Sequence, residues 1–175
     1  LVAEAYPFGP GGAFLHPFDN HNSVLGIREF ARSKGVPEER IVAVPLGPDL
    51  GIDAELLERE LKSAPRRAAK LFAFPAQSNF SGVQHPLEWI EKAQSRGYDV
   101  LLDAAAFVPT NRLDLGKWKP DYVALSFYKM FGYPTGIGAL LIHRRAFGKL
   151  QRPWFAGGTV NFASVQGEGH YLAPN

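Results

Sequence analysis

Five side chains able to do acid–base or covalent chemistry stand where apolar runs of this sequence give way to polar segments. They are a lysine, a carboxylate, an amide, a hydroxyl and an imidazole: Lys129, Asp103, Asn79, Ser126 and His21. An amine surrounded by apolar groups loses hydration, which makes it a better nucleophile toward a carbonyl. A lysine for the aldehyde, a carboxylate for the ring nitrogen and hydroxyls for the phosphate are what pyridoxal 5′-phosphate (PLP) requires of a protein.

Each of these residues also has an ordinary structural interpretation. Asp103 and Asn79 both fit turn chemistry, and Ser126 is unremarkable at a strand end. A lone histidine near a helix start, such as His21, usually faces solvent, and Lys129 could be a surface lysine. The site hypothesis therefore depends on all five converging on the carboxyl edge of one sheet, where α/β folds bind their ligands.

The elements that must position these residues follow from the spacing of apolar runs. Apolar runs alternate with helical segments at intervals of about thirty residues, which is the rhythm of βαβ units. This pattern predicts an α/β fold, a three-layer and mostly parallel sheet with helices on both faces. The last strand follows the lysine segment with no helix between, so it is expected to run antiparallel. The predicted strands are 13–15, 41–44, 71–74, 100–102, 122–125 and 137–142.

Apolar residues spaced three and four apart predict the helices that cover this sheet. The run 41–44 is continuously apolar, which is typical of a parallel strand buried on both faces. The segment 126–138 is expected to hold Lys129 in a loop made irregular by its Gly and Pro residues. The expected helices are 1–6, a segment capped by Asp19 or Asn20 that buries Val24, Ile27 and Ala31, a segment capped by Asp53 that buries Leu57 and Leu61, and Pro86–Arg96.

Composition limits the classes of function. The chain has 175 residues, 46% of them hydrophobic, which suits one domain with a core and excludes a disordered protein. No apolar run is long enough to cross a membrane, and a net charge of +2 with interspersed signs argues against nucleic acid or membrane as a partner. There is no cysteine, so disulfides and thiolate metal sites are excluded, and no metal site is predicted. We expect a cytoplasmic internal piece of a longer protein, because the chain begins without Met or a signal-peptide pattern.

Four segments occur in the order and spacing of the class V aminotransferases, a group that includes the cysteine desulfurases. They are Asp19–Val24, Ser78–Gly82, Leu102–Ala106 and Ser126–Lys129. The sequence of residues 126–138 most closely resembles the N-terminal domain of the molybdenum cofactor sulfurases. It is Ser-Phe-Tyr-Lys-Met-Phe-Gly-Tyr-Pro-Thr-Gly-Ile-Gly. The resemblance covers nearly the whole chain and implies the large domain of a PLP-dependent transferase of fold type I.

The resemblance implies a role for each candidate residue. Lys129 would hold PLP as an aldimine and shuttle a proton, and Asp103 would pair with the pyridine nitrogen. His21 would stack on the ring and assist catalysis. Asn79 would contact the ring hydroxyl and Ser126 the phosphate, so all five residues would bind the cofactor.

The same resemblance implies that residues 1–175 form only the core of a PLP-binding large domain. A phosphate cup would lie before Leu1, and a small domain, with a substrate-binding arginine and a sulfur-accepting cysteine, would lie beyond Asn175. The segment Gly157–Asn175 is expected to leave the sheet and cover a neighbouring subunit, which predicts a homodimer.

The function implied is PLP-dependent sulfur transfer from an amino acid, with a sulfur-acceptor protein as a further partner. Two residues depart from the desulfurases, which usually have Gln at the position of Ala106 and His at the position of Tyr128. These departures leave class V transamination, and lyase or epimerase chemistry at the α carbon, open as alternatives.

Two readings from other classes are weaker. A catalytically inactive binding domain that keeps the fold is disfavoured because Lys129 and Asp103 are both retained. A flavodoxin-like or Rossmann nucleotide-binding module needs a Gly-rich turn after its first strand, whereas residues 9–12 precede that strand.

Overall fold

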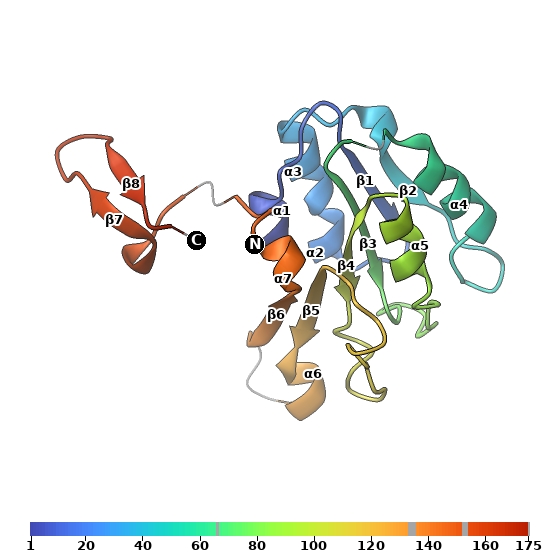
Figure 1. The fold of residues 1–175 in the computed structure, drawn as a ribbon. Coiled ribbons are helices and arrows are strands. Elements are labelled where there is room, and N and C mark those ends of the chain that lie inside the picture. The colour runs from blue at the N-terminus through green and yellow to red at the C-terminus, as the bar shows by residue number, and fades with distance from the viewer. Residues whose placement is uncertain (66, 133–135, 152–153, 175) are drawn as a thin grey trace.

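A six-stranded, mostly parallel sheet organises the chain (Figure 1). The computed structural model describes residues 1–65, 67–132, 136–151 and 154–174. The strand order is β2-β1-β3-β4-β5-β6, in which the first five strands run parallel and β6 pairs antiparallel with β5. The predicted antiparallel last strand is therefore confirmed. The bounds are β1 Ala13–Pro17, β2 Ile41–Val44, β3 Lys70–Pro75, β4 Asp99–Asp103, β5 Tyr122–Ser126 and β6 Gly138–Ile142.

Helices cover both faces of the sheet, as the three-layer prediction requires. Successive residues of a strand point to opposite faces, so Phe72 and Phe74 enter one core while Leu71 and Ala73 enter the other. Helices α4 and α5 close the first core, and α1, α2, α3 and α7 close the second (Figure 1). The helices are α1 Val2–Ala5, α2 Asn22–Leu25, α3 Ile27–Ser33, α4 Ala54–Ser63, α5 Trp89–Ser95, α6 Phe127–Phe131 and α7 Arg144–Phe147, with 3₁₀ turns at Glu38–Arg40 and Gly157–Thr159.

Helix α4 forms as its sequence predicts. The Asp53 side chain accepts a hydrogen bond from the Leu56 amide at 3.0 Å, which satisfies one of the free donors of the first turn. Leu57 and Leu61, one turn apart, are both buried against the sheet. The cap and the apolar stripe together place α4 where its spacing indicated.

Three local predictions were wrong at element boundaries. The helix predicted to follow the first strand is divided at Gly26 into α2 and α3, and its cap is His21 instead of Asp19 or Asn20. Helix α5 begins at Trp89. The residues from Pro86 form a turn before it, in which backbone amides donate to carbonyls three residues earlier. Lys129 lies in the short helix α6 and not in a loop, while residues 133–135 of the same predicted segment lie outside the described residues.

The strand β2 is also placed differently from its prediction. It lies at the edge of the sheet and pairs with β1, so its apolar run does not mark a strand buried on both faces. Val44 is buried, whereas the other residues of β2 retain solvent exposure. The run in β3 has the buried central position instead, since every residue from Lys70 to Pro75 is buried.

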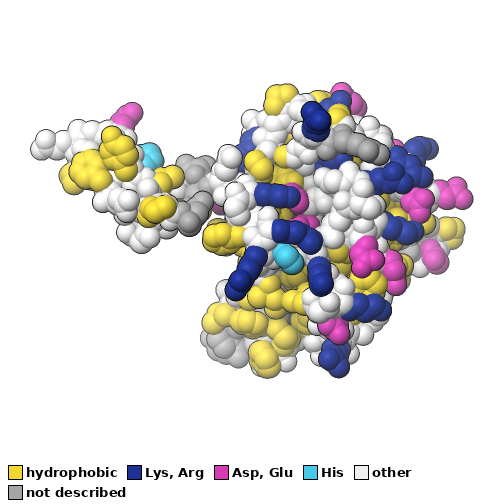
Figure 2. All heavy atoms as spheres, in the orientation of Figure 1, with side chains coloured by type: hydrophobic (Ala, Val, Ile, Leu, Met, Phe, Trp, Pro, Cys, Tyr) yellow, Lys and Arg dark blue, Asp and Glu magenta, His cyan; other side chains and the backbone are white. Residues whose placement is uncertain are grey.

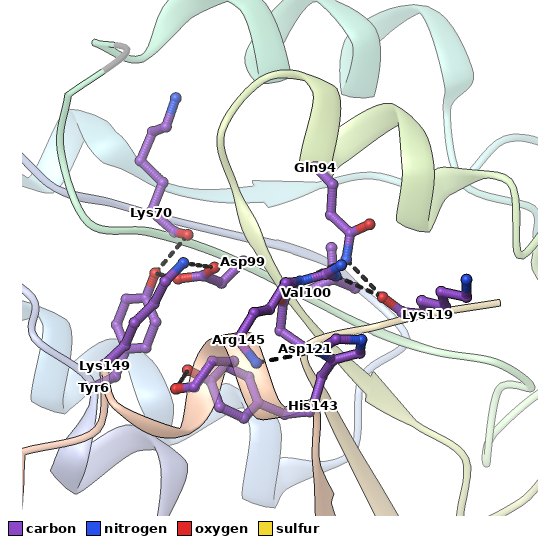
Figure 3. Close-up of polar contacts among 12 residues, drawn as sticks. Tyr6, Lys70, Gln94, Asp99, Val100, Lys119, Asp121, His143, Arg145 and Lys149 are labelled. Carbon is purple, nitrogen blue, oxygen red and sulfur yellow. Dashed lines mark hydrogen bonds and ion pairs between the residues drawn. The ribbon is translucent and has the colours of Figure 1, made fainter. Parts of the chain in front are cut away.

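Two buried carboxylates, Asp99 and Asp121, lie at the amino ends of β4 and β5 (Figure 3). Asp121 accepts hydrogen bonds from the Val100 amide, Gln94 Nε2 and Arg145 Nε, each at 2.9 Å. Asp99 accepts from the Tyr6 hydroxyl at 2.8 Å, and burial followed by the Asp99 charge raises the pKa of Tyr6 far above its ordinary value. The Asp121 contact with Val100 ties β4 to the start of β5 at the end opposite the site, whereas Asp99 ties β4 to Tyr6.

The last described segment forms a separate hairpin of β7, Val160–Ala163, and β8, His170–Leu172. It stands away from the main sheet (Figure 1), as the sequence predicted for the segment from residue 157 onward. Within the described residues no helix has the length and apolarity needed to span a membrane.

Candidate active site

All five candidate residues line one cavity at the carboxyl edge of the sheet. The cavity has a volume of about 460 Å³, within the usual range of roughly 300–1,000 Å³ for small-ligand sites. The sheet brings them together because β4 and β5 run parallel and end at the same edge. The residues are His21, Asn79, Asp103, Ser126 and Lys129.

Asp103 is the last residue of β4 and is oriented by local hydrogen bonds. Its Oδ1 accepts from the Ala105 amide at 3.0 Å, so the turn interpretation of this residue is also correct. Its carbonyl accepts from the Ala76 amide at 2.8 Å, which joins β4 to the start of the neighbouring loop. One carboxylate oxygen is thereby held by the backbone, and Oδ2 is the oxygen left for a ligand.

Lys129 reaches across the cavity from α6. Its ammonium donates to Asn79 Oδ1 at 2.5 Å, although the two residues are 50 positions apart in the chain. The side chain is half-buried, and the nearby aromatic residues Tyr128 and Phe131 are themselves exposed. The lysine therefore faces the cavity with an amide oxygen as its partner.

Asn79 is presented by a tight loop that returns on itself. Ser78 is buried, and its hydroxyl accepts from the amides of Phe80 and Ser81 at 3.3 Å and 3.2 Å. Gly82 has φ of 76°, a left-handed conformation that favours glycine, and its amide donates to the Ser78 carbonyl. The loop chemistry explains why an exposed asparagine has a defined position.

His21 and Ser126 both stand at helix starts. The Nδ1 of His21 accepts from the Ser23 amide at 3.2 Å and lies 2.9 Å from the Ser23 hydroxyl, so the ring is held by the first turn of α2. Ser126 is the N-cap residue of α6, one turn before the lysine. Both side chains reach the cavity from the ends of the elements that bear them.

The two positions that depart from the desulfurase pattern also face this cavity. Ala106 contributes only a methyl group, which cannot hydrogen-bond to a ligand. Tyr128 precedes the lysine and is partly exposed at the cavity wall. The cavity therefore lacks a hydrogen-bonding side chain at Ala106, whereas Tyr128 replaces an imidazole with a phenol.

Sequence reasoning missed a buried, hydrogen-bonded acid–histidine pair near the site. Asp19, expected to cap a helix, instead accepts from His85 Nε2 at 2.7 Å. No local pattern marks this pair, because its partners are 66 residues apart and His85 was assigned no role. Gln77 is a further cavity-lining residue.

A buried histidine, His16, lies near the carboxyl end of β1. Burial lowers the pKa of His16 from its ordinary value, the hydrogen bond with the Pro17 carbonyl opposes this, and the Arg28 charge lowers it further. The cavity itself is lined by the amine of Lys129 and the carboxyl group of Asp103. In the described part of the chain, no group of three or more acidic or histidine side chains could hold a metal ion.

This set of groups fits an aromatic aldehyde cofactor better than a metal. An amine can attach a carbonyl group, a free carboxylate oxygen can hold a protonated ring nitrogen, and an imidazole can pack on a ring face. The amide of Asn79 and the hydroxyl of Ser126 add hydrogen-bonding groups in the same cavity. The chemistry of the donor set is that expected for PLP.

Comparisons with known proteins agree with this chemistry. The family model for aminotransferase class V matches residues 1–175. Molybdenum cofactor sulfurase 3 of Aedes aegypti is 47% identical over 174 residues, covering 93% of this chain and 21% of that protein. The molybdenum cofactor sulfurase of Homo sapiens is 41% identical over 187 residues, covering 98% of this chain and 20% of that protein.

Solved structures give the same result at the level of the fold. A cysteine desulfurase from Thermococcus onnurineus has a TM-score of 0.77 and 25% identity, covering 99% of this chain and 42% of that one. The cysteine desulfurase CsdA of Escherichia coli has a TM-score of 0.76 and 25% identity, covering 99% and 43%. The chain spans about a fifth of the length of the curated relatives it matches.

Proposed function

This chain belongs to the aminotransferase class V family, and from that membership we propose that it forms the core of a PLP-binding large domain. The proposed activity is sulfur transfer from an amino acid, with L-cysteine as the substrate. The observation that carries the proposal is the single cavity in which the Lys129 amine contacts Asn79 while Asp103 lines the same wall. The similarity to molybdenum cofactor sulfurases and cysteine desulfurases supports sulfur transfer over transamination.

Each residue has a defined task in this proposal. The Lys129 amine attaches the cofactor and then carries a proton at Nζ, for which the Asn79 oxygen is a nearby hydrogen-bond partner. Asp103 holds a proton on the ring nitrogen through its free oxygen. His21 covers one ring face, and Ser126 binds the phosphate. When bound, PLP supplies an electron sink for charge that develops at the substrate's α carbon.

The overall reaction balances with a thiol as acceptor. The C–S bond of L-cysteine breaks, its sulfur joins the acceptor thiol as a persulfide, and alanine is released. A thiolate must attack the sulfur as it leaves. These 175 residues contain no cysteine, so the acceptor thiol belongs to another part of the protein or to a sulfur-acceptor protein.

The test uses the full-length protein. Borohydride reduction followed by peptide mapping should locate PLP on Lys129, and the matched control Lys92→Ala, which changes an exposed lysine of α5, should leave the labelling intact. Incubation with L-cysteine and a thiol should give alanine and persulfide. Cofactor on Lys92 would refute the assignment of Lys129. A 2-oxo acid from another amino acid, with no alanine from cysteine, would replace sulfur transfer with transamination.

We also propose that the protein acts as a homodimer. Exposed hydrophobic side chains gather on the hairpin (Figure 2), where Phe162 is 55% exposed and Tyr171 is 71% exposed. A hairpin this apolar and so far from its own sheet is suited to cover a second copy. An active monomer in sedimentation experiments would refute this.

The cytoplasmic location stays a prediction from the sequence, which cell fractionation would test.

A further inference from the structure

A buried acid–histidine pair lies behind the cavity. Asp19 Oδ2 and His85 Nε2 are 2.7 Å apart, with side chains 1% and 0% exposed. A carboxylate can only accept, so His85 Nε2 donates the proton of this hydrogen bond. A polar pair buried this completely restricts the positions of both segments, because separating it would leave two polar groups without solvent or partner.

The Asp19 side of the pair belongs to the turn that presents His21. The turn is anchored on both sides, since the Phe18 amide donates to the Val44 carbonyl and Asn20 Nδ2 donates to the Pro17 and Ala73 carbonyls. Asp19 lies two residues before His21, which starts α2. A shift of Asp19 would therefore move the imidazole at the cavity wall.

The His85 side belongs to the loop that presents Asn79. The His85 amide donates to the Ala76 carbonyl at 3.0 Å and closes the base of this loop. Across a hollow of about 160 Å³, Asn79 and Phe80 face the segment 19–22. The pair therefore joins the segment that bears His21 to the loop that bears the partner of Lys129.

We propose that Asp19 and His85 are positioning residues that set His21 and Asn79 at a fixed separation around the cofactor. This inference rests on the proposed function, and it concerns residues to which the sequence assigned no role in the site. Neither side chain lines the main cavity, so both act through the residues that do.

The test is a set of variants of the full-length protein, measured by PLP affinity and by the visible circular dichroism of bound PLP. At metal sites, losing a residue that orients a ligand costs about 10- to 100-fold in affinity or activity. We expect Asp19→Ala and His85→Ala each to raise the Kd for PLP by about 10-fold and to change the dichroism band, and the double variant to be no worse than either single one. Asp19→Asn keeps an oxygen that can accept from His85 Nε2, so it should stay within about threefold of wild type.

The control is Asp99→Ala, which removes a carboxylate at the amino end of β4, the end of the strand opposite the cavity. It should lower the thermal midpoint while leaving the Kd and the dichroism band unchanged. If the Asp19 and His85 variants behave like Asp99→Ala, the pair is structural and the proposal fails. If wild type itself binds no PLP, the proposed function fails, and the positioning role fails with it. Hydrogen exchange then shows whether Asp19→Ala still loosens the loop 76–85, which reports the link between the segments independently of cofactor.

Discussion

The contacts of Asp121 should dominate the local stability of β4 and β5. Replacing Asp121 with alanine leaves the buried Val100 amide without its acceptor, which costs about 1–3 kcal/mol. Gln94 is half-buried and can turn to water, so its loss adds only about 0.5 kcal/mol. The Arg145 side chain is 44% exposed and its ion pair adds about 0–1 kcal/mol. The total for Asp121→Ala is about 1.5–4.5 kcal/mol.

Hydrogen exchange of the full-length protein measures this loss where it occurs. Since about 1.4 kcal/mol is a factor of ten, amides of residues 99–103 and 122–126 should exchange about 10- to 1,500-fold faster in Asp121→Ala. Asp121→Asn keeps one acceptor and should lose about half of that free energy. Arg145→Ala, the matched control, leaves the Val100 contact in place and should change exchange by less than about fivefold.

Two results would refute this reasoning. Exchange in Asp121→Ala within about fivefold of wild type would show that the Val100 amide finds another partner. An equal effect of Arg145→Ala would show that the exposed ion pair, and not the buried backbone contact, carries the stability.

Two further predictions concern single groups. Asp103→Asn should keep PLP bound but lower turnover by about 100-fold, because an amide lacks the charge that holds a proton on the ring nitrogen; unchanged kcat at full PLP occupancy would assign that proton to another residue. His16 has a lowered pKa in the folded state, so its contribution to stability is present above its ordinary pKa of about 6.5 and is lost as the pH falls below it. Urea unfolding should therefore show a smaller loss of stability on acidification in His16→Gln than in wild type, and parallel curves would contradict this.

Local patterns in the sequence were enough to predict the architecture. Short continuous apolar runs indicate the strands, and apolar spacing with the capping Asp53 indicates a helix, because burial and capping act over a few neighbouring residues. The antiparallel β6 followed from the lack of room for a crossover helix. The same patterns placed Asp103 and Lys129 at strand ends that a parallel sheet must bring to one edge.

Contacts between distant segments could not be read from those patterns. The pairing of Asp19 with His85, and the contact of Lys129 with Asn79, join residues 66 and 50 positions apart. The edge position of β2 likewise depends on strand order, because a short apolar run has the same sequence pattern in a central strand and in an edge strand. Such contacts are set by the order and register of the strands once all of them have packed. The local sequence therefore determines which residue types are available to the site. The packing of the whole sheet determines the distances between them and their partners.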